Sequence, residues 1–254
     1  MKANTLKNFS KAVAECDPTV PWSNELKLYS DSKLSVYYAP FEHINTKAKV
    51  VICGITPGKT QSTQALETAK IGLIAESELV KIQEKAKQAA SFKGFRKPLS
   101  AMLDLVGLNK KLNIETCNEL FSSKADLVHY TSTIRYPVVL ANGNNYNGTP
   151  KVCNHAFLQK MLDKYLAEEV TALGPDCLWI PLGKASTEGL EYLVDKGVLK
   201  PNQLISGLPH PSGANAERIA YFLGNKPKNK LSVKVNSHTL DTAKTHLINK
   251  IKAA

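Results

Sequence analysis

Short apolar runs that alternate with segments of helical periodicity are the feature that most limits what this chain can fold into. The runs have the length and β-branched character of buried strands, and they cover residues 34–41, 49–55, 126–134, 176–183 and 202–210. Helical spacing of apolar residues is clearest at 154–173, a segment that Gly174 and Pro175 end. The alternation predicts an α/β fold with a mainly parallel sheet and helices on both faces.

The length and composition fit one large α/β domain or two small ones. The chain has 254 residues, of which 43% are hydrophobic, so it can bury a full core. We favour a single domain over residues 1–254, in which a lysine-rich loop at 226–230 precedes a last helix at about 239–252.

The apolar segments and the cysteines indicate the compartment. Every apolar run is shorter than the roughly 18 residues of a membrane span, and the N-terminal residues 1–16 contain no apolar stretch long enough for export. We therefore expect a cytoplasmic protein that does not enter a membrane. The five cysteines include no CxxC pair and are expected to be reduced, mostly buried thiols.

The net charge favours a polyanionic partner. It is +11 at pH 7, with basic clusters at 93–97, 109–111 and 226–230. Such a surface attracts a nucleic acid or an anionic membrane. Lysines scattered on an ordinary surface would give the same excess, so the charge alone does not decide the partner.

The stretch VVICGITPGKTQ, residues 50–61, has the composition of a nucleotide-binding loop but not its length. Cys53 stands where the phosphate loop of nucleotide hydrolases needs its first glycine, and Pro57 has no N–H to donate. What remains is a tight turn from strand to helix, whose backbone can approach a ligand closely.

A second loop follows the last expected strand. In sheets of this kind, ligands bind beyond the carboxyl ends of the strands. The segment LPHPSGANAERIAYFL, residues 208–223, places His210 there and runs on into a helix. A lone histidine in such a place often only bonds a turn, but the rigid turn after it and Asn215 fit a ligand loop equally well.

Four motifs of this chain resemble those of the uracil-DNA glycosylase superfamily. They are GITPG at 54–58, TSTIRYP at 131–137, WIPLGKAS at 179–186 and HPSGAN at 210–215. The resemblance covers roughly residues 45–225. It implies a three-layer sandwich around a central, mainly parallel four-stranded sheet. It also implies a monomer that needs no metal or other cofactor. Such a base excision repair enzyme binds DNA, flips out a deaminated or damaged base and hydrolyses its N-glycosidic bond.

The same resemblance implies catalytic and base-pocket roles. His210 matches the histidine that stabilises negative charge on the departing base. Thr56 stands where active relatives position water with Asp, Asn or Glu, and a hydroxyl orients water less well. Phe95 is the expected stacking ring, preferred to Phe92 because it lies nearer a helix start. Thr131 and Ser132 stand where relatives read the pyrimidine edge with Asn.

Contacts to the DNA backbone are expected from both loops and the third strand. The matched residues are Gly54, Pro57, Gly58, Lys59, Gln61, Arg135, Pro211, Ser212, Gly213 and Asn215.

Rival functions follow from the departures. The iron–sulfur branch of the superfamily needs four cysteine ligands, including an N-terminal CxxC, and this chain has only Cys16 there. Thr56 favours a nucleic-acid-binding protein that kept the glycosylase fold and has weak or no catalysis. Hydrolysis of a free nucleoside is a third possibility, although it would not need the basic surface.

Overall fold

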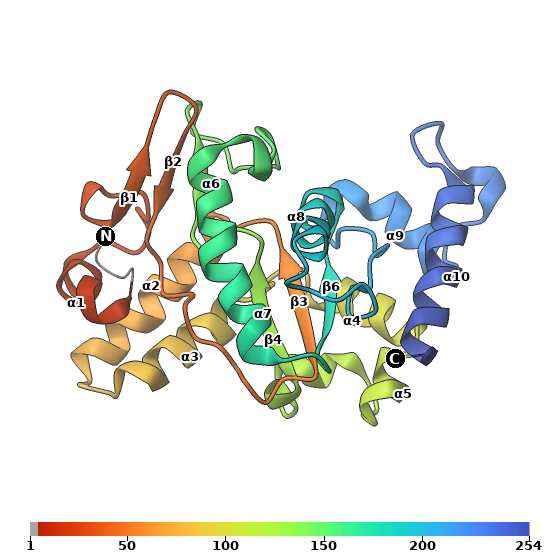
Figure 1. The fold of residues 1–254 in the computed structure, drawn as a ribbon, viewed down its shortest axis with the longest axis horizontal. Coiled ribbons are helices and arrows are strands. Elements are labelled where there is room, and N and C mark those ends of the chain that lie inside the picture. The colour runs from red at the N-terminus through yellow and green to blue at the C-terminus, as the bar shows by residue number, and fades with distance from the viewer. Residues whose placement is uncertain (1–4, 254) are drawn as a thin grey trace. The chain divides into compact units, whose positions relative to one another are not determined.

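The structure is a computed structural model that describes residues 5–253. It contains both helices and strands, in groups that follow one another along the sequence, so the chain is a mixed α/β protein (Figure 1). The strands are β1 Lys27–Ser30, β2 Leu34–Tyr37, β3 Val50–Gly54, β4 Val128–Ser132, β5 Val138–Leu140 and β6 Leu178–Pro181. The α-helices are α1 Leu6–Glu15, α2 Lys59–Ile74, α3 Leu79–Ala90, α4 Arg96–Leu105, α5 Leu108–Leu112, α6 Ala156–Met161, α7 Ala167–Leu173, α8 Lys184–Asp195, α9 Ala216–Phe222 and α10 Ser237–Ala253.

The chain divides into two compact units, each built from segments far apart in the sequence. Among the described residues, the first unit comprises 5–44, 55–93 and 130–172, and the second comprises 45–54, 94–129 and 173–253. The expectation of one domain over residues 1–254 stays a prediction.

The first unit contains an antiparallel sheet of order β1-β2-β5. Helices α1, α2 and α3 pack on one another in the same unit. An aromatic cluster lies in its core: Phe9 stacks on Tyr38 with ring centroids 4.1 Å apart, and Tyr38 also meets Tyr136. The expected strand at 34–41 is therefore present in part, as β2, but it pairs antiparallel.

The second unit carries the small parallel sheet, of order β4-β3-β6. Its β3 and β6 run parallel from Val50 opposite Leu178 to Cys53 opposite Pro181 (Figure 1). Every residue of β3 is buried, which explains why its sequence is a continuous apolar run and not an alternating one. The last three residues of β4 belong to the first unit.

The prediction of a central four-stranded sheet is wrong, because each sheet has three strands. The expected strand at 202–210 makes only one parallel bridge, between Leu204 and Trp179. Pairing stops there for a local reason. Gly207 has a φ of +124°, which is outside the strand region, and the prolines at 209 and 211 have no N–H to give to a ladder.

A buried side chain compensates for the missing ladder. Gln203, which is 3% exposed, donates its amide N–H groups to the carbonyl oxygens of Gly174 and Cys177 at 3.0 and 2.9 Å. Its own Oε1 accepts from the N–H of Lys200 at 3.2 Å. Gln203 therefore holds the segment before the bridge against the start of β6 by side-chain bonds.

The segment expected to be one helix at 154–173 is helical from residue 156 to residue 173, with a π-helical turn in its middle. It consists of α6, a π-helix at Leu162–Leu166, and α7. Gly174 ends it with a φ of +73°, the left-handed conformation that glycine adopts at helix C-termini. The last helix, α10, covers the expected 239–252 with a few residues more at its start.

Replacing Gln203 tests its role in the second unit. We expect Gln203→Ala to lower the free energy of unfolding by about 2–3 kcal/mol, because two buried carbonyls lose their donors. The exposed neighbour Asn202→Ala is the control and should change it by less than about 0.5 kcal/mol. Urea denaturation measures both. Equal effects of the two substitutions would contradict the stabilising role of the Gln203 side-chain hydrogen bonds.

Candidate functional site

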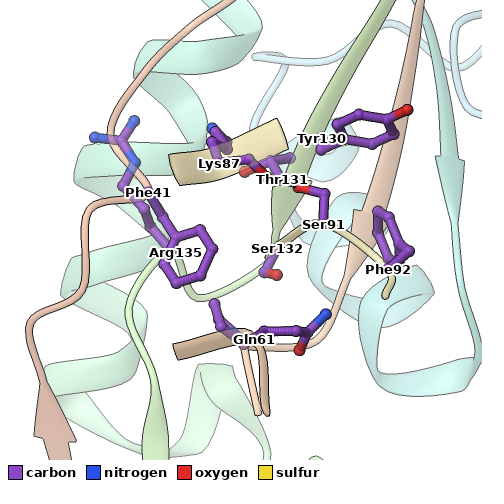
Figure 2. Close-up of a pocket in the computed structure, with 10 residues that line it drawn as sticks. Phe41, Gln61, Lys87, Ser91, Phe92, Tyr130, Thr131, Ser132 and Arg135 are labelled. Carbon is purple, nitrogen blue, oxygen red and sulfur yellow. Dashed lines mark hydrogen bonds between the residues drawn. The ribbon is translucent and has the colours of Figure 1, made fainter. Parts of the chain in front are cut away.

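A narrow pocket in the first unit brings together four segments that are far apart in the sequence. Its walls come from Phe41 after β2, from the loop and helix start after β3, from the end of α3, and from the end of β4 with the residues that follow (Figure 2). The lining residues are Phe41, Pro57, Gln61, Lys87, Ser91, Phe92, Tyr130, Thr131, Ser132 and Arg135. The cavity volume is about 20 Å³, enough for about one water molecule.

The Thr56 hydroxyl is hydrogen-bonded to backbone groups beside this pocket. It donates to the carbonyl oxygen of Tyr136 at 2.9 Å and accepts the N–H of Val138 at 3.2 Å. The loop after β3 is thereby tied to the start of β5. Because its only proton is used in this way, Thr56 keeps little capacity to orient a water molecule.

Gly58 and Gln61 close the first turn of α2. The side-chain Oε1 of Gln61 accepts the N–H of Gly58 at 2.7 Å, which satisfies one of the free N–H groups of the helix start. Gly58 therefore has no N–H to offer a phosphate. Lys59, the first residue of α2, is exposed and is the cation of this loop that a phosphate can reach.

Hydroxyl groups from the end of β4 form the polar part of the wall. Thr131 is 7% exposed, and its buried hydroxyl has no hydrogen-bond partner among the described residues. Ser132 is half-buried and lines the same pocket. The two residues proposed from sequence to read the base thus lie in one wall, although a regular strand would point them to opposite faces.

Arg135 is a buried part of the wall and not a surface group. It is 5% exposed, and its Nε and Nη2 donate to Glu169 at 2.8 and 2.7 Å. Nη2 also donates to the carbonyl of Tyr165 at 3.1 Å, within the π-helix. Burial alone would lower the pKa of the guanidinium, but the Glu169 carboxylate keeps that pKa above its ordinary value. The expected contact of Arg135 with DNA stays a prediction.

Of the two phenylalanines compared from sequence, Phe92 is the one that lines the pocket. It is 7% exposed and meets Tyr130 edge to face, with ring centroids 5.8 Å apart. Phe95, the ring chosen from sequence, precedes α4 in the second unit and lies against His210 at 5.8 Å. The sequence placed both phenylalanines near a helix start, and that criterion does not reveal which one faces a cavity.

His210 has a defined orientation in the second unit. Its Nδ1 accepts the N–H of Ser212 at 3.3 Å, so the proton of a neutral ring is on Nε2. Burial lowers the pKa of the imidazole below its ordinary value, which keeps the ring neutral at pH 7. The backbone of Gly183, which has a φ of +86°, packs against the His210 side chain. A Cβ added at Gly183 would lie 3.3 Å from the His210 Cβ.

The loop after His210 is braced by side chains. Asn215 donates through Nδ2 to the Ser212 hydroxyl at 3.3 Å and accepts from Arg218 Nη1 at 3.2 Å. Gly213 is exposed, whereas Pro211 is buried. A short, fixed turn with one exposed glycine results.

The residues expected at the DNA backbone therefore differ in accessibility. Lys59 and Gly213 are exposed; Gly58, Gln61, Ser212 and Asn215 are half-buried; Gly54, Pro57, Arg135 and Pro211 are buried.

Among residues 5–253, no group of three or more His, Cys, Asp or Glu side chains is placed to hold a metal ion. Within the same residues, no helix combines the length and the apolar character that crossing a membrane requires.

The fold and the site define a mixed α/β protein with a narrow polar pocket that contains two buried cationic side chains. This chain belongs to the family of the uncharacterized protein YoxB of Bacillus subtilis (strain 168). The two sequences are 34% identical over 227 residues, which cover 87% of this chain and 89% of YoxB. No family model matches the chain.

The pairing of Arg135 predicts an unequal effect of two neighbouring glutamates. Glu169 is fully buried, whereas the side chain of Glu168 is 59% exposed and lies 3.7 Å from the guanidinium. We expect Glu169→Gln to lower the free energy of unfolding by about 3–5 kcal/mol, since it leaves a buried cation without its charge partner. Glu168→Gln should change it by no more than about 1 kcal/mol. Denaturant unfolding compares them, and similar losses would argue against the pairing.

Proposed function

We propose that this protein is a DNA glycosylase, which hydrolyses the N-glycosidic bond of a deaminated or damaged base flipped out of DNA. The observation that carries the proposal is the convergence of Pro57 of GITPG and the nearby Gln61 with residues of TSTIRYP on one pocket. The resemblance of these motifs to those of glycosylases rests on sequence alone and is independent of the pocket. Aromatic rings from Phe41, Phe92 and Tyr130 give this pocket apolar surfaces on which a base can stack.

The electrostatics support the same reading. The net charge of +11 suits a DNA partner. His210 is a neutral donor, held by Ser212 so that its Nε2–H is available. A departing base gains negative charge on its carbonyl oxygen, and a neutral donor is the kind of group that stabilises such charge.

The supply of water is the weak step of this chemistry. Among the described residues that line the pocket there is no carboxylate, and Thr56 uses its hydroxyl in backbone bonds. We therefore propose that the rate depends mainly on stabilising the departing base, after which a weakly oriented water adds to the sugar.

The bonds of Thr56 also favour a second candidate function, a DNA-binding protein of the same fold without catalysis. The two functions are separated by incubating the protein with oligonucleotides that each carry one uracil, hypoxanthine, xanthine or alkylated base. Alkali then cleaves any abasic site. Strand cleavage at a modified base supports the glycosylase. DNA binding with no cleavage in the whole panel supports the binding protein.

The role of His210 predicts a loss of rate without a loss of binding. We expect His210→Ala to slow base excision by about 100-fold to 1,000-fold, the effect of removing one preorganised donor. The exposed His238→Ala in α10 is the control and should keep the wild-type rate. Single-turnover excision and DNA binding by fluorescence anisotropy measure the two properties. Parallel losses in rate and binding would instead make His210 a structural residue.

The DNA footprint predicts a steep dependence on salt. Each neutralised phosphate of duplex DNA contributes a slope of about 0.9 to the decrease of log affinity with log salt concentration. Lys59 is exposed at the start of α2, so Lys59→Ala should lower the slope by about one unit. The exposed Lys11→Ala in α1 serves as the control and should leave it unchanged. An affinity independent of salt would refute the footprint.

A further inference from the structure

We propose that Gln61 selects the ring that enters the pocket of the first unit, by offering amide N–H donors to a carbonyl oxygen on the ring edge. The ligand class is a pyrimidine with a carbonyl where cytosine has an amino group. The inference rests on the proposed function, in that it takes the pocket to hold the base. It assigns the reading of that base to α2, and not to the Thr131–Ser132 segment alone.

The orientation of the Gln61 amide is fixed by its helix. Oε1 accepts the N–H of Gly58 at 2.7 Å, and a backbone N–H can bond only to the oxygen end of an amide. The nitrogen end, with two N–H groups, is then free for the pocket that Gln61 lines. Figure 2 shows Gln61 across this pocket from Thr131 and Lys87, with its amide toward the side of Phe92.

The rest of the wall adds donors and positive charge. Thr131 and Ser132 contribute hydroxyls that can donate, and the Thr131 hydroxyl is buried without a partner among the described residues. Lys87 is 4% exposed, and its Nζ donates to the carbonyl of His43 at 2.6 Å. No carboxylate lies among the described lining residues. The Gln61 amide N–H groups and the Lys87 ammonium can only donate, so they favour a carbonyl over an amino group on the ring, whereas the hydroxyls can bond either group.

The size of the cavity restricts the ring as well. A volume of about 20 Å³ admits no base without movement. Phe41 and Phe92, at 6% and 7% exposure, are large side chains in the wall, and a ring enters when such side chains swing aside. A single six-membered ring requires less displacement than a fused purine, because every additional wall atom that moves gives up packing contacts.

The substitution Gln61→Glu separates the role of Gln61 in ligand selection from its role in capping α2. A carboxylate can still accept the N–H of Gly58, but it replaces the free N–H donors by a second acceptor. Gln64→Glu, one turn further along α2 and outside the pocket lining, introduces the same charge and is the matched control. Gln61→Met removes donor and acceptor together. Thermal unfolding verifies that each variant is folded.

The measurement is the binding of 2′-deoxyuridine and 2′-deoxycytidine to the full-length protein, followed by NMR line shape and by the shift of the Gln61 side-chain amide. We expect wild type and Gln64→Glu to bind deoxyuridine at least about 10-fold more tightly, Gln61→Glu to prefer deoxycytidine, and Gln61→Met to lose the preference. If wild type and Gln61→Glu had the same ratio of deoxyuridine to deoxycytidine affinity, the inference would be overturned. It would also be overturned if the wild type bound neither nucleoside.

These outcomes are separable from those of the proposed function. Selective binding of deoxyuridine by a protein that cleaves no modified oligonucleotide would refute the glycosylase and leave the role of Gln61 intact. Excision of a base with a preference that Gln61→Glu does not alter would refute the role of Gln61 alone.

Discussion

The buried ion pair of Arg135 and Glu169 is the interaction on which the first unit depends. A guanidinium at 5% exposure is stable only with a charge partner, and Glu169 supplies it at 2.7 Å from α7. The pair and the Tyr165 carbonyl fix the segment that follows β4 against the helices at 156–173. Through this segment the pair also fixes a wall of the pocket, while the Thr56 hydroxyl fixes the loop opposite. The pocket is thus framed by a buried ion pair and by part-buried hydrogen bonds of Thr56, and not by apolar packing alone.

Much of the fold could be predicted from local patterns, and the errors have local causes. The buried strands β3 and β6 are continuous apolar runs, so their burial could be read directly from sequence. The antiparallel sheet could not, because β1 is short and its end residues are exposed. No strand forms at 202–210, although the segment is apolar, because Gly207 and the two prolines interrupt the pairing after one bridge.

The candidate site divides in a similar way. Motif order pointed to Pro57, Gln61, Thr131 and Ser132, and all four line one pocket. The choice between Phe92 and Phe95 needed the path of a loop, which no spacing rule supplies. The burial of Arg135 depends on Glu169, 34 residues further along the chain. Lys87 and Phe41 belong to no motif, and the only signal in the sequence is an apolar or helical context that many other residues share.

Gln61 has two tasks in one side chain, since it caps α2 through Oε1 and faces the pocket with its nitrogen. A residue with two tasks can vary only in ways that keep both atoms in place. Short or apolar side chains would lose the hydrogen bond to the N–H of Gly58. Only glutamine and glutamate have both the length and the acceptor oxygen to keep it. Glutamine and glutamate codons differ by one nucleotide. A single mutation could therefore convert one ligand preference into the opposite one without passing through a destabilised protein.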